Sequence, residues 1–386
     1  MMPNSFDQII DRKGSACFKY DAMKLMYGRD DLLALWVADM DFAVSPQIQA
    51  AIRHRAEHPL YGYNFKAPAF KESLDAWLMK RHGWNTTEHK LISLPSLMTA
   101  LALAILSLTK EGDGILIQSP VYPPFHSQAS DHGRKLLINP LIGEDGVYRI
   151  DWVDFEHQAA QAKMFVLCNP HNPVGRVFSP EELARMADIC RKHKVIIFSD
   201  EIHADLVFTP HHHIPIATLA EDITLTGISP AKSFNIAGIG TAVLISQNPD
   251  LIKPVEKLNF ALHTYMGNSM GIVAFTAAYG ESEAWLEELL RYLKDNRDFI
   301  EIELPNILPS VKISPIEGTY LAWLDFREYG LPEDELMRIL RDDCRLALNQ
   351  GSTFGDEGLG FMRMNFGCPR SILEEALTRL QKFPKE

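Results

Sequence analysis

Lys232 stands in a mostly apolar stretch, with serine, alanine and phenylalanine as neighbours. Lysine is seldom buried without a partner, and burial lowers the pKa of its ammonium group. A neutral lysine amine is a nucleophile that can form a Schiff base with a carbonyl compound. Most lysines are ordinary solvated side chains, so Lys232 indicates this chemistry only if the fold brings other suitable groups to it.

Polar residues follow three apolar runs in the middle of the chain. These polar segments are residues 119–122, 169–175 and 199–203. Apolar runs of this length are typical of strands buried on both faces of a parallel sheet. Ligands of open α/β sheets bind beyond the carboxyl ends of the strands. The pattern therefore predicts one crevice in which the three polar segments converge.

A strand, a helix and a second strand form the clearest piece of regular order. Ser179 and Glu182 have the spacing of a capping box, with Pro180 at the first helical position. The two strands of such a unit should be parallel, with a right-handed crossover. The expected elements are strands at 163–168 and 195–198, a helix from Ser179 to about residue 193, and further strands at 114–117 and 242–245.

The chain after Glu283 differs from the middle, because long charged amphipathic helices dominate it. The expected elements there are helices at 285–303, 333–342 and 371–382 and strands at 320–324 and 361–365. We therefore expect a large α/β domain over residues 48–283, with a mostly parallel central sheet flanked by helices. A smaller α+β domain should combine residues 1–47 with residues 284–386.

The uncharged stretch between Lys90 and Lys110 is nearly long enough to span a bilayer, which takes roughly 20 residues. Several hydroxyl side chains interrupt it, and Pro95 would break a continuous span. We therefore expect a short extended piece, a turn and then a buried helix from about Thr99.

Composition excludes several functions. The 386 residues include 38 basic and 50 acidic side chains, for a net charge of −12, and no block of lysine or arginine occurs. Binding to a phosphate backbone needs clustered cations, so nucleic acid is not an expected partner. The five cysteines are scattered, and residues 1–7 lack the features of a secretory signal. We expect reduced thiols in a cytoplasmic protein without a membrane association.

Three motifs in the middle of the chain resemble those of a known family. They are Asn169-Pro170-His171-Asn172-Pro173-Val174-Gly175, Ser199-Asp200-Glu201, and Ser229 followed three positions later by Lys232. In this order and separation they are similar to the motifs of pyridoxal-phosphate enzymes of fold type I, the class I/II aminotransferase group. The resemblance runs from about Trp36 to Glu375, and it implies the fold of that group.

A finer resemblance is to the MalY/PatB-type C-S lyases, also called cystathionine β-lyases. The segments that carry it are residues 37–42, 120–125, 200–205 and 232–235. His203 is informative, because typical aminotransferases have tyrosine at that place. This resemblance implies an enzyme that cleaves the bond between Cβ and sulfur in cystathionine or related cysteine S-conjugates, giving a thiol, pyruvate and ammonia.

The resemblance also implies roles for individual residues. Lys232 would hold pyridoxal phosphate as a Schiff base and then act as the base on the substrate's α-proton. Asp200 would pair with the ring nitrogen and keep it protonated, so that the ring can accept electrons. Tyr122 would stack on the ring. The implied catalytic residues are Lys232, Tyr122 and Asp200, and the implied cofactor-binding residues are Lys232, Asp200, Asn172, Tyr122, His203, Ser229, Leu97, Met98 and Tyr63.

Arg363 is a single cation in an otherwise apolar strand. A guanidinium binds a carboxylate through two parallel hydrogen bonds, and in the resembling family this arginine holds the substrate's α-carboxylate. Ala38 and Asn172 are the other residues implied to bind substrate. The alternative is that Arg363 makes a structural ion pair with an acidic residue.

The expected phosphate site departs from the family pattern. The resemblance places Ser96, Leu97 and Met98 in a loop that precedes a helix, whose free N–H groups would bind phosphate, yet the family usually has glycine where Ser96 stands. Aminotransferases tend to have arginine where Gly240 stands, and its absence favours the lyase branch. Tyr63 resembles a tyrosine that reaches the phosphate from a neighbouring subunit, which implies a homodimer. Gln350, in a loop expected near the site, replaces the usual proline or aspartate.

Two other features suggest functions that we discount. Three adjacent histidines, residues 211–213, cannot all face one metal ion, and the prolines around them indicate a surface loop. Gly238 and Gly240 are too few for a dinucleotide-binding motif. We expect neither a metal site nor nucleotide binding.

Two alternatives to the lyase remain open at this point. A transaminase would use the same cofactor and would diverge from the lyase only after the α-proton is removed. A regulatory protein that binds a transcription factor and uses the fold as a scaffold is the alternative from a different class of function.

Overall fold

The structure, a computed structural model, describes residues 5–144 and 146–384. An eight-stranded sheet forms its centre, in the order β2-β9-β8-β7-β6-β3-β4-β5. The strands are β2 (Lys90–Leu94), β3 (Gly114–Ser119), β4 (Lys135–Glu144), β5 (Val147–Ile150), β6 (Ala162–Cys168), β7 (Ile196–Asp200), β8 (Thr224–Ile228) and β9 (Ala242–Ser246). Strands β8, β7, β6, β3 and β4 pair in parallel, and antiparallel pairs lie at both edges. The predicted mostly parallel sheet is confirmed.

Helix α8 (Pro180–His193) begins where the sequence predicts. The backbone N–H of Glu182 donates to Ser179 Oγ at 3.2 Å, and the N–H of Ser179 donates to Glu182 Oε2 at 2.9 Å. Both halves of the capping box are therefore present. The helix connects β6 to β7, which are parallel neighbours.

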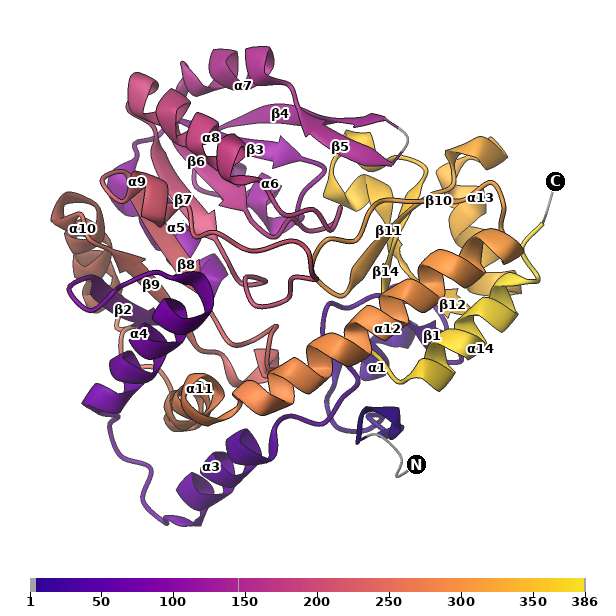
Figure 1. The fold of residues 1–386 in the computed structure, drawn as a ribbon, viewed down its shortest axis with the longest axis horizontal. Helices are drawn as coiled ribbons and strands as arrows, with labels where there is room; N and C mark the ends of the chain where they lie inside the picture. The colour runs from indigo at the N-terminus through magenta and orange to yellow at the C-terminus, as the bar shows by residue number, and fades with distance from the viewer. Residues whose placement is uncertain (1–4, 145, 385–386) are drawn as a thin grey trace.

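Helices cover both faces of the sheet (Figure 1). Along β6, Met164 and Val166 pack with α5, α6 and α10, whereas Phe165 and Leu167 face the opposite way and pack with α7, α8 and α9. This alternation is expected of a strand buried on both faces. The other helices around this sheet are α4 (Pro68–His82), α5 (Leu97–Leu108), α6 (Pro124–Asp131), α7 (Trp152–Ala159), α9 (Ala217–Ala220), α10 (Pro249–Ala261) and α11 (Ser269–Glu281).

A smaller antiparallel sheet lies in the C-terminal part, in the order β10-β11-β14-β13. Its strands are β10 (Lys312–Ile313), β11 (Leu321–Asp325), β13 (Asn349–Gln350) and β14 (Phe361–Asn365), with helices α13 (Glu333–Arg338) and α14 (Arg370–Leu380) beside them. The N-terminal segment contributes α1 (Phe18–Asp21), α2 (Met23–Tyr27) and β1 (Leu33–Ala34) to this part, whereas the next helix, α3 (Pro46–Glu57), packs against α11. Strand β1 pairs in parallel with β12 (Leu346–Ala347), so the two ends of the chain build this part together.

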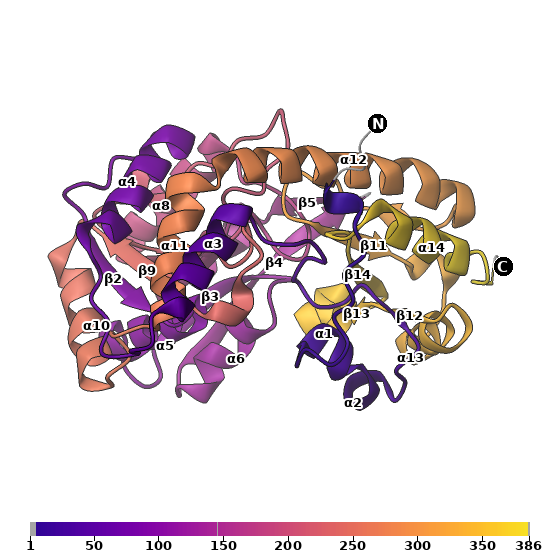
Figure 2. The same cartoon turned by 90° about the horizontal axis from the view of Figure 1, so that it is seen from below.

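Helix α12 (Glu283–Ile307) runs along both halves of the molecule (Figures 1 and 2). Its buried residues, including Leu286, Leu289, Leu293 and Ile300, recur at helical spacing and form one apolar stripe. That stripe belongs to a core cluster that contains side chains from the first and last segments of the chain. The helix therefore holds the two sheets in a fixed relation.

Some helix boundaries differ from the sequence-based expectation; helix α12, for example, ends at Ile307 rather than at residue 303. Helix α5 starts at Leu97 rather than at Thr99, because Ser96 Oγ accepts a hydrogen bond from the Thr99 N–H at 3.1 Å and caps the helix at that earlier point. The helix expected over residues 333–342 stops being α-helical at Arg338. It continues as a π-helical turn, Ile339–Asp343, in which Ile339 and Leu340 are both buried.

The uncharged stretch between Lys90 and Lys110 forms strand β2, a turn and helix α5, as predicted. Within the part of the chain that the structure describes, no helix combines the length and the apolar character needed to cross a membrane.

The capping box of α8 provides a test of this fold. Replacing Ser179 with alanine leaves the Glu182 N–H without its side-chain acceptor and should cost about 1 kcal/mol of stability. We expect the thermal midpoint to fall by roughly 2 °C, measured by circular dichroism. Ser127→Ala is the control, since Ser127 is exposed and does not cap a helix. Equal midpoints for Ser179→Ala and Ser127→Ala would contradict the role of the cap.

Candidate active site

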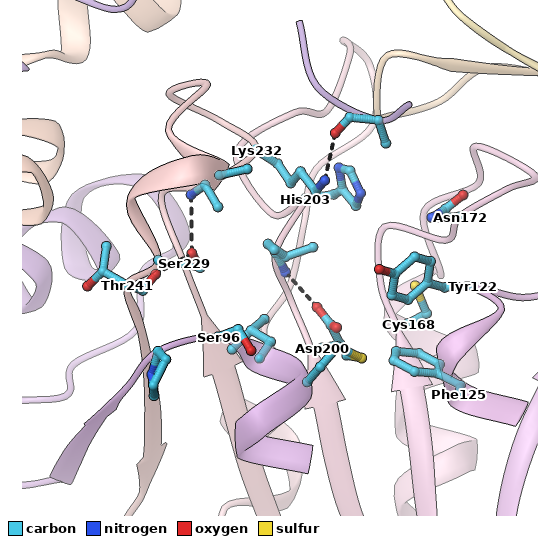
Figure 3. Close-up of a pocket in the computed structure, with 18 residues that line it drawn as sticks. Ser96, Tyr122, Phe125, Cys168, Asn172, Asp200, His203, Ser229, Lys232 and Thr241 are labelled. Atoms are coloured by element: carbon cyan, nitrogen blue, oxygen red, sulfur yellow. Dashed lines mark hydrogen bonds between the residues drawn. The ribbon is translucent and has the colours of Figure 1, made fainter. Parts of the chain in front are cut away.

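A cavity of about 180 Å³ lies at the carboxyl ends of β3, β6, β7 and β8 (Figure 3). Such an edge of a parallel sheet is the place where the sequence predicts a crevice. The predicted residues that line the cavity are Ala38, Leu97, Met98, Tyr122, Asn172, Asp200, His203, Ser229 and Lys232. The three polar segments after the apolar runs therefore do converge.

Lys232 lies in the turn after β8, and its side chain enters the cavity. Its Nζ donates a hydrogen bond to the backbone carbonyl of Ala38 at 2.6 Å. Burial and the charge of Arg363 lower the pKa of Lys232 to about 8. About a tenth of its amine is therefore neutral and nucleophilic at pH 7, far more than for an ordinary lysine.

Asp200 closes strand β7 at the floor of the cavity. Its Oδ1 accepts a hydrogen bond from the Ile202 N–H at 3.1 Å, as Figure 3 shows. Burial raises the pKa of Asp200 to about 7, against the opposing effects of this hydrogen bond and of Lys232. A cationic ring nitrogen placed beside Asp200 would favour its ionised form.

Arg363 on β14 is buried next to the cavity, and its hydrogen-bond partners are neutral. Its Nη1 donates to Asn172 Oδ1 at 3.1 Å, and its Nη2 donates to Asn349 Oδ1 at 2.7 Å and to the Trp36 carbonyl at 2.8 Å. Burial lowers the pKa of Arg363 to about 10. Among residues 5–144 and 146–384, no carboxylate pairs with it, and its Nε has no partner. The structural ion pair considered as an alternative is therefore not seen.

The opposite end of the cavity has the features of a phosphate site. Figure 3 places Ser96, Ser229 and Thr241 there, away from Tyr122 and Asn172. The N-terminus of the 12-residue helix α5 opens towards this end, and its free N–H groups suit an anion. Ser229 Oγ donates to the Thr241 carbonyl at 2.7 Å, so it must give up that bond to donate to a phosphate.

The structure shows the surroundings of the three residues that depart from the family pattern. Ser96 has an extended backbone (φ −158°, ψ 164°), which does not require glycine, and its side chain caps α5. Gly240 lines the cavity with a left-handed backbone (φ +62°), a conformation that disfavours arginine. Gln350 lies on β13, where its Nε2 donates to Glu333 Oε2 at 2.6 Å.

Tyr122 and His203 both line the cavity, and burial affects the pKa of each. Burial raises the pKa of Tyr122, so its hydroxyl stays protonated. Burial and the charges of Lys232 and Arg363 lower the pKa of His203, so its imidazole is neutral. The Nδ1 of His203 has no partner among the described residues.

Tyr63 does not reach the cavity of its own chain. Its side chain is 93% exposed, and Leu60, Tyr61 and Phe65 beside it are also exposed. The structure therefore leaves a row of large apolar side chains in solvent at this segment, and the role implied for Tyr63 would need a second subunit.

The interpretation of residues 211–213 as a surface loop is wrong for His213. Its side chain is buried, and its Nε2 lies 2.9 Å from Glu201 Oε2. The flanking prolines do mark a loop, but this loop folds back onto the segment after β7 and buries its last histidine. Among the described residues, no group of three or more histidine, cysteine or acidic side chains is arranged to hold a metal ion.

Sequence reasoning missed the side chains that hold residues 36–42. Tyr320 donates its hydroxyl proton to the Ala38 carbonyl at 2.8 Å. Asn235 Nδ2 donates to the carbonyls of Met40 and Phe42, and Asn365 Nδ2 donates to two other carbonyls of the same loop. Asn235 lies within a motif that carried the family resemblance, and this was the available signal. Tyr320 gave no such signal.

Comparisons with known proteins agree with this geometry. The sequence profile of the family described as aminotransferase class I and II matches residues 30–380. The chain belongs to this family. It is 36% identical to cystathionine beta-lyase PatB from Bacillus subtilis (strain 168), over 98% of this chain and 99% of that one. It is also 32% identical to the protein MalY of Escherichia coli (strain K12), over 97% of each chain.

A solved structure also resembles this member of the class I/II aminotransferase family. The PLP-bound C-S lyase from Staphylococcus hominis superposes with a TM-score of 0.91 at 30% identity, over 98% of this chain and 97% of that chain. The chain therefore has the aminotransferase fold and lies in the MalY/PatB C-S lyase branch of the family.

The residues of this class I/II family member fit pyridoxal phosphate. Lys232 offers an amine for its aldehyde, and the N-terminus of α5 faces the end where its phosphate would bind. Asp200 is a buried carboxyl group with a raised pKa, and a cationic ring nitrogen beside it would lower that pKa. Asn172 Oδ1 already accepts from Arg363, which leaves its amide N–H groups for the ring oxygen. Each polar group of the cofactor therefore meets a complementary group.

The pKa of Lys232 predicts how the cofactor attaches to the apoprotein. Only the neutral amine reacts, and its fraction grows as pH rises through the lowered pKa of about 8. The rate of attachment should therefore rise up to about pH 8 and then level off. For an ordinary lysine, the rate would continue to rise up to about pH 10.4. Stopped-flow absorbance after mixing with pyridoxal phosphate measures this rate.

Lys232→Ala is the control, and it should give no visible absorption band of attached cofactor. A rate that still climbs between about pH 9 and 10 would show that burial does not lower the pKa of Lys232.

Proposed function

We propose that this protein is a pyridoxal-phosphate-dependent carbon-sulfur β-lyase that acts on cystathionine or other cysteine S-conjugates. The observation that carries the proposal is the buried Arg363, a cation without an anion, beside the cavity that holds Lys232. A guanidinium in this state is suited to the carboxylate of an amino acid. The 36% identity to cystathionine beta-lyase PatB supports the choice of reaction.

The side chains of the cavity divide the reaction between them. Arg363 holds the substrate's α-carboxylate and so orients Cα towards Lys232. Lys232, whose pKa is about 8, takes the α-proton onto Nζ. When bound, pyridoxal phosphate supplies an acceptor for the electron pair left at Cα.

Cleavage then results from that electron pair. The pair forms a double bond between Cα and Cβ, and the sulfur leaves with the electrons of the Cβ–S bond. A proton returned to the sulfur gives the thiol, and hydrolysis of the released enamine gives pyruvate and ammonia. Tyr122 and the neutral His203 line the same cavity.

Transamination is the second candidate, because the family also contains aminotransferases. Both reactions begin with removal of the α-proton, and they diverge at the second step. Transamination would require that a proton be returned to the bound cofactor, whereas the lyase reaction expels the thiol from Cβ. Gly240, which stands where aminotransferases tend to have an arginine, supports the lyase.

A direct assay separates these functions. Purified protein loaded with pyridoxal phosphate should convert cystathionine to pyruvate and a free thiol, and Lys232→Ala should lower the rate at least about 100-fold because it removes the base. Lactate dehydrogenase coupling measures pyruvate, and a thiol reagent measures the other product. Amino-group transfer that needs a 2-oxo acid and releases no thiol would favour the transaminase.

The same variant addresses the regulatory alternative. If the protein acted as a scaffold for a transcription factor, Lys232→Ala would leave that regulation unchanged. Failure of every tested cysteine S-conjugate to give pyruvate would refute the lyase proposal.

We also propose a homodimer in which Tyr63 reaches the phosphate of the partner subunit. Tyr63 is 93% exposed, and Leu60, Tyr61 and Phe65 extend the exposed apolar row. Exposed apolar patches of this kind mark interaction sites. The phosphate end of the cavity has helix N–H groups and hydroxyls but no arginine among the described residues that line it, so a tyrosine from a second copy would complete it.

Mixed dimers test the contribution of Tyr63. Homodimers of Tyr63→Ala and of Lys232→Ala should both be impaired, for different reasons. Equal co-expression should restore up to about a quarter of wild-type activity, because half of the dimers are mixed and each mixed dimer has one intact site. The specific activity of the co-purified pool measures this recovery. In the control experiment, Tyr61→Ala takes the place of Tyr63→Ala. No recovery above the parent variants would contradict a shared site.

The proposed location is the cytoplasm, and the proposed process is sulfur amino-acid metabolism. All five cysteines are free thiols, and four of them are buried, which suits a reducing compartment. With cystathionine as substrate the thiol product would be homocysteine, so the reaction would contribute to methionine synthesis.

A further inference from the structure

The loop of residues 36–42, which we call the bridging loop, runs across the active site and touches both of its key cations. The Trp36 carbonyl accepts from Arg363 Nη2 at 2.8 Å, and the Ala38 carbonyl accepts from Lys232 Nζ at 2.6 Å. These contacts use backbone atoms, so they depend on where the loop lies and not on its side chains. Whatever fixes the bridging loop therefore fixes the surroundings of Lys232 and Arg363.

Two cations from the N-terminal segment hold the acidic side chains of this loop. Arg12 places Nη2 at 2.6 Å from Asp39 Oδ2 and Nη1 at 2.7 Å from Asp41 Oδ1. Lys19 Nζ lies 2.7 Å from Asp41 Oδ2 and donates to the Asp39 carbonyl at 3.3 Å. The four side chains form a closed cluster of two cations and two carboxylates.

Burial distinguishes this cluster from the ion pairs on the surface. The Lys19 side chain is fully buried, and that of Asp41 is 6% exposed. Exposed ion pairs contribute little, whereas removal of one partner from a buried pair leaves an uncompensated charge. The Trp36 side chain adds a neutral link, because its Nε1 donates to the Lys19 carbonyl at 2.9 Å. The N-terminal segment is therefore attached to the bridging loop at several points.

The cluster is also electrostatically connected to Lys232. Burial and the charge of Arg363 lower the pKa of Lys232, and the Asp39 carboxylate acts in the opposite direction. If Arg12 were removed, Asp39 would lose its close partner, and among the described residues it would keep one cation, Lys19, with Nζ at 3.7 Å. An Asp39 carboxylate freed in this way would repel the substrate's carboxylate from the pocket.

We propose that Arg12 and Lys19 are positioning residues for the reaction. By holding Asp39 and Asp41, they fix the bridging loop across the mouth of the cavity, so that Ala38 borders the place where Arg363 receives the substrate. The inference rests on the proposed function only in taking an amino acid as the substrate.

Substrate affinity in the cofactor-loaded enzyme tests this role. Arg12→Gln and Lys19→Met should each raise the KM for cystathionine and the Kd for L-alanine at least about tenfold, because small misplacements can cost up to about 100-fold. L-alanine has no leaving group at Cβ, and its binding is measured from the visible spectrum of the bound cofactor. Affinity for pyridoxal phosphate should stay unchanged, and kcat should change less than KM.

Matched variants separate positioning from a general loss of structure. Lys13→Gln and Lys24→Met remove exposed cations of the same segment and should leave both constants unchanged. Arg12→Lys keeps the charge without the two-pronged contact and should recover part of the affinity. If Lys19→Met does not fold, the partly exposed Arg12 still provides the test.

Two outcomes would overturn the inference. Values of KM and Kd within about twofold of wild type for Arg12→Gln, at a lowered melting temperature, would make the cluster purely structural. An equal loss of affinity for pyridoxal phosphate would have the same meaning. If the wild type does not cleave cystathionine, the proposed function fails, whereas L-alanine binding still decides the role of Arg12.

Discussion

Three ionisable side chains share one buried site without neutralising one another, and the rest of the structure depends on this arrangement. Lys232 donates to a carbonyl, Arg363 donates to amides and a carbonyl, and Asp200 accepts from a backbone N–H. In a medium of low dielectric constant such groups would be stabilised by pairing directly. The fold prevents this, because Lys232 lies in the turn after β8, Asp200 lies on β7 and Arg363 lies on β14. The stabilisation that direct pairing would have given can therefore come from a ligand that carries the opposite charges.

The parts of the fold that were predictable are those fixed by local rules. The apolar runs that became β6 and β7, and the Ser179 cap between them, needed only neighbouring residues to be interpreted. The crevice was predictable from the same elements, because parallel strands end at one edge. His213 was placed wrongly because turn-forming residues locate a loop along the sequence but do not show whether it packs inward.

The unpredicted parts of the site arise from contacts between distant positions. The Ala38 carbonyl meets Lys232 across 194 positions and Tyr320 across 282. A backbone carbonyl has no residue type that could mark it, so no pattern in the sequence identifies Ala38 as the acceptor. Family resemblance drew attention to residues 37–42 as a motif, but only the structure explains the motif as a loop held by both sheets and by the N-terminal segment.

The pairing of β1 with β12 has a consequence for the order in which the protein is made. Trp36 and Arg363, whose contact completes the site, are 327 positions apart. At a synthesis rate of about 5–20 residues per second, roughly 15–65 s separate the appearance of the two residues. During that interval the apolar side chains around Trp36 have no partner from the C-terminal part. The segment around Trp36 is therefore made long before its C-terminal partners and can reach its final place only after they have been made.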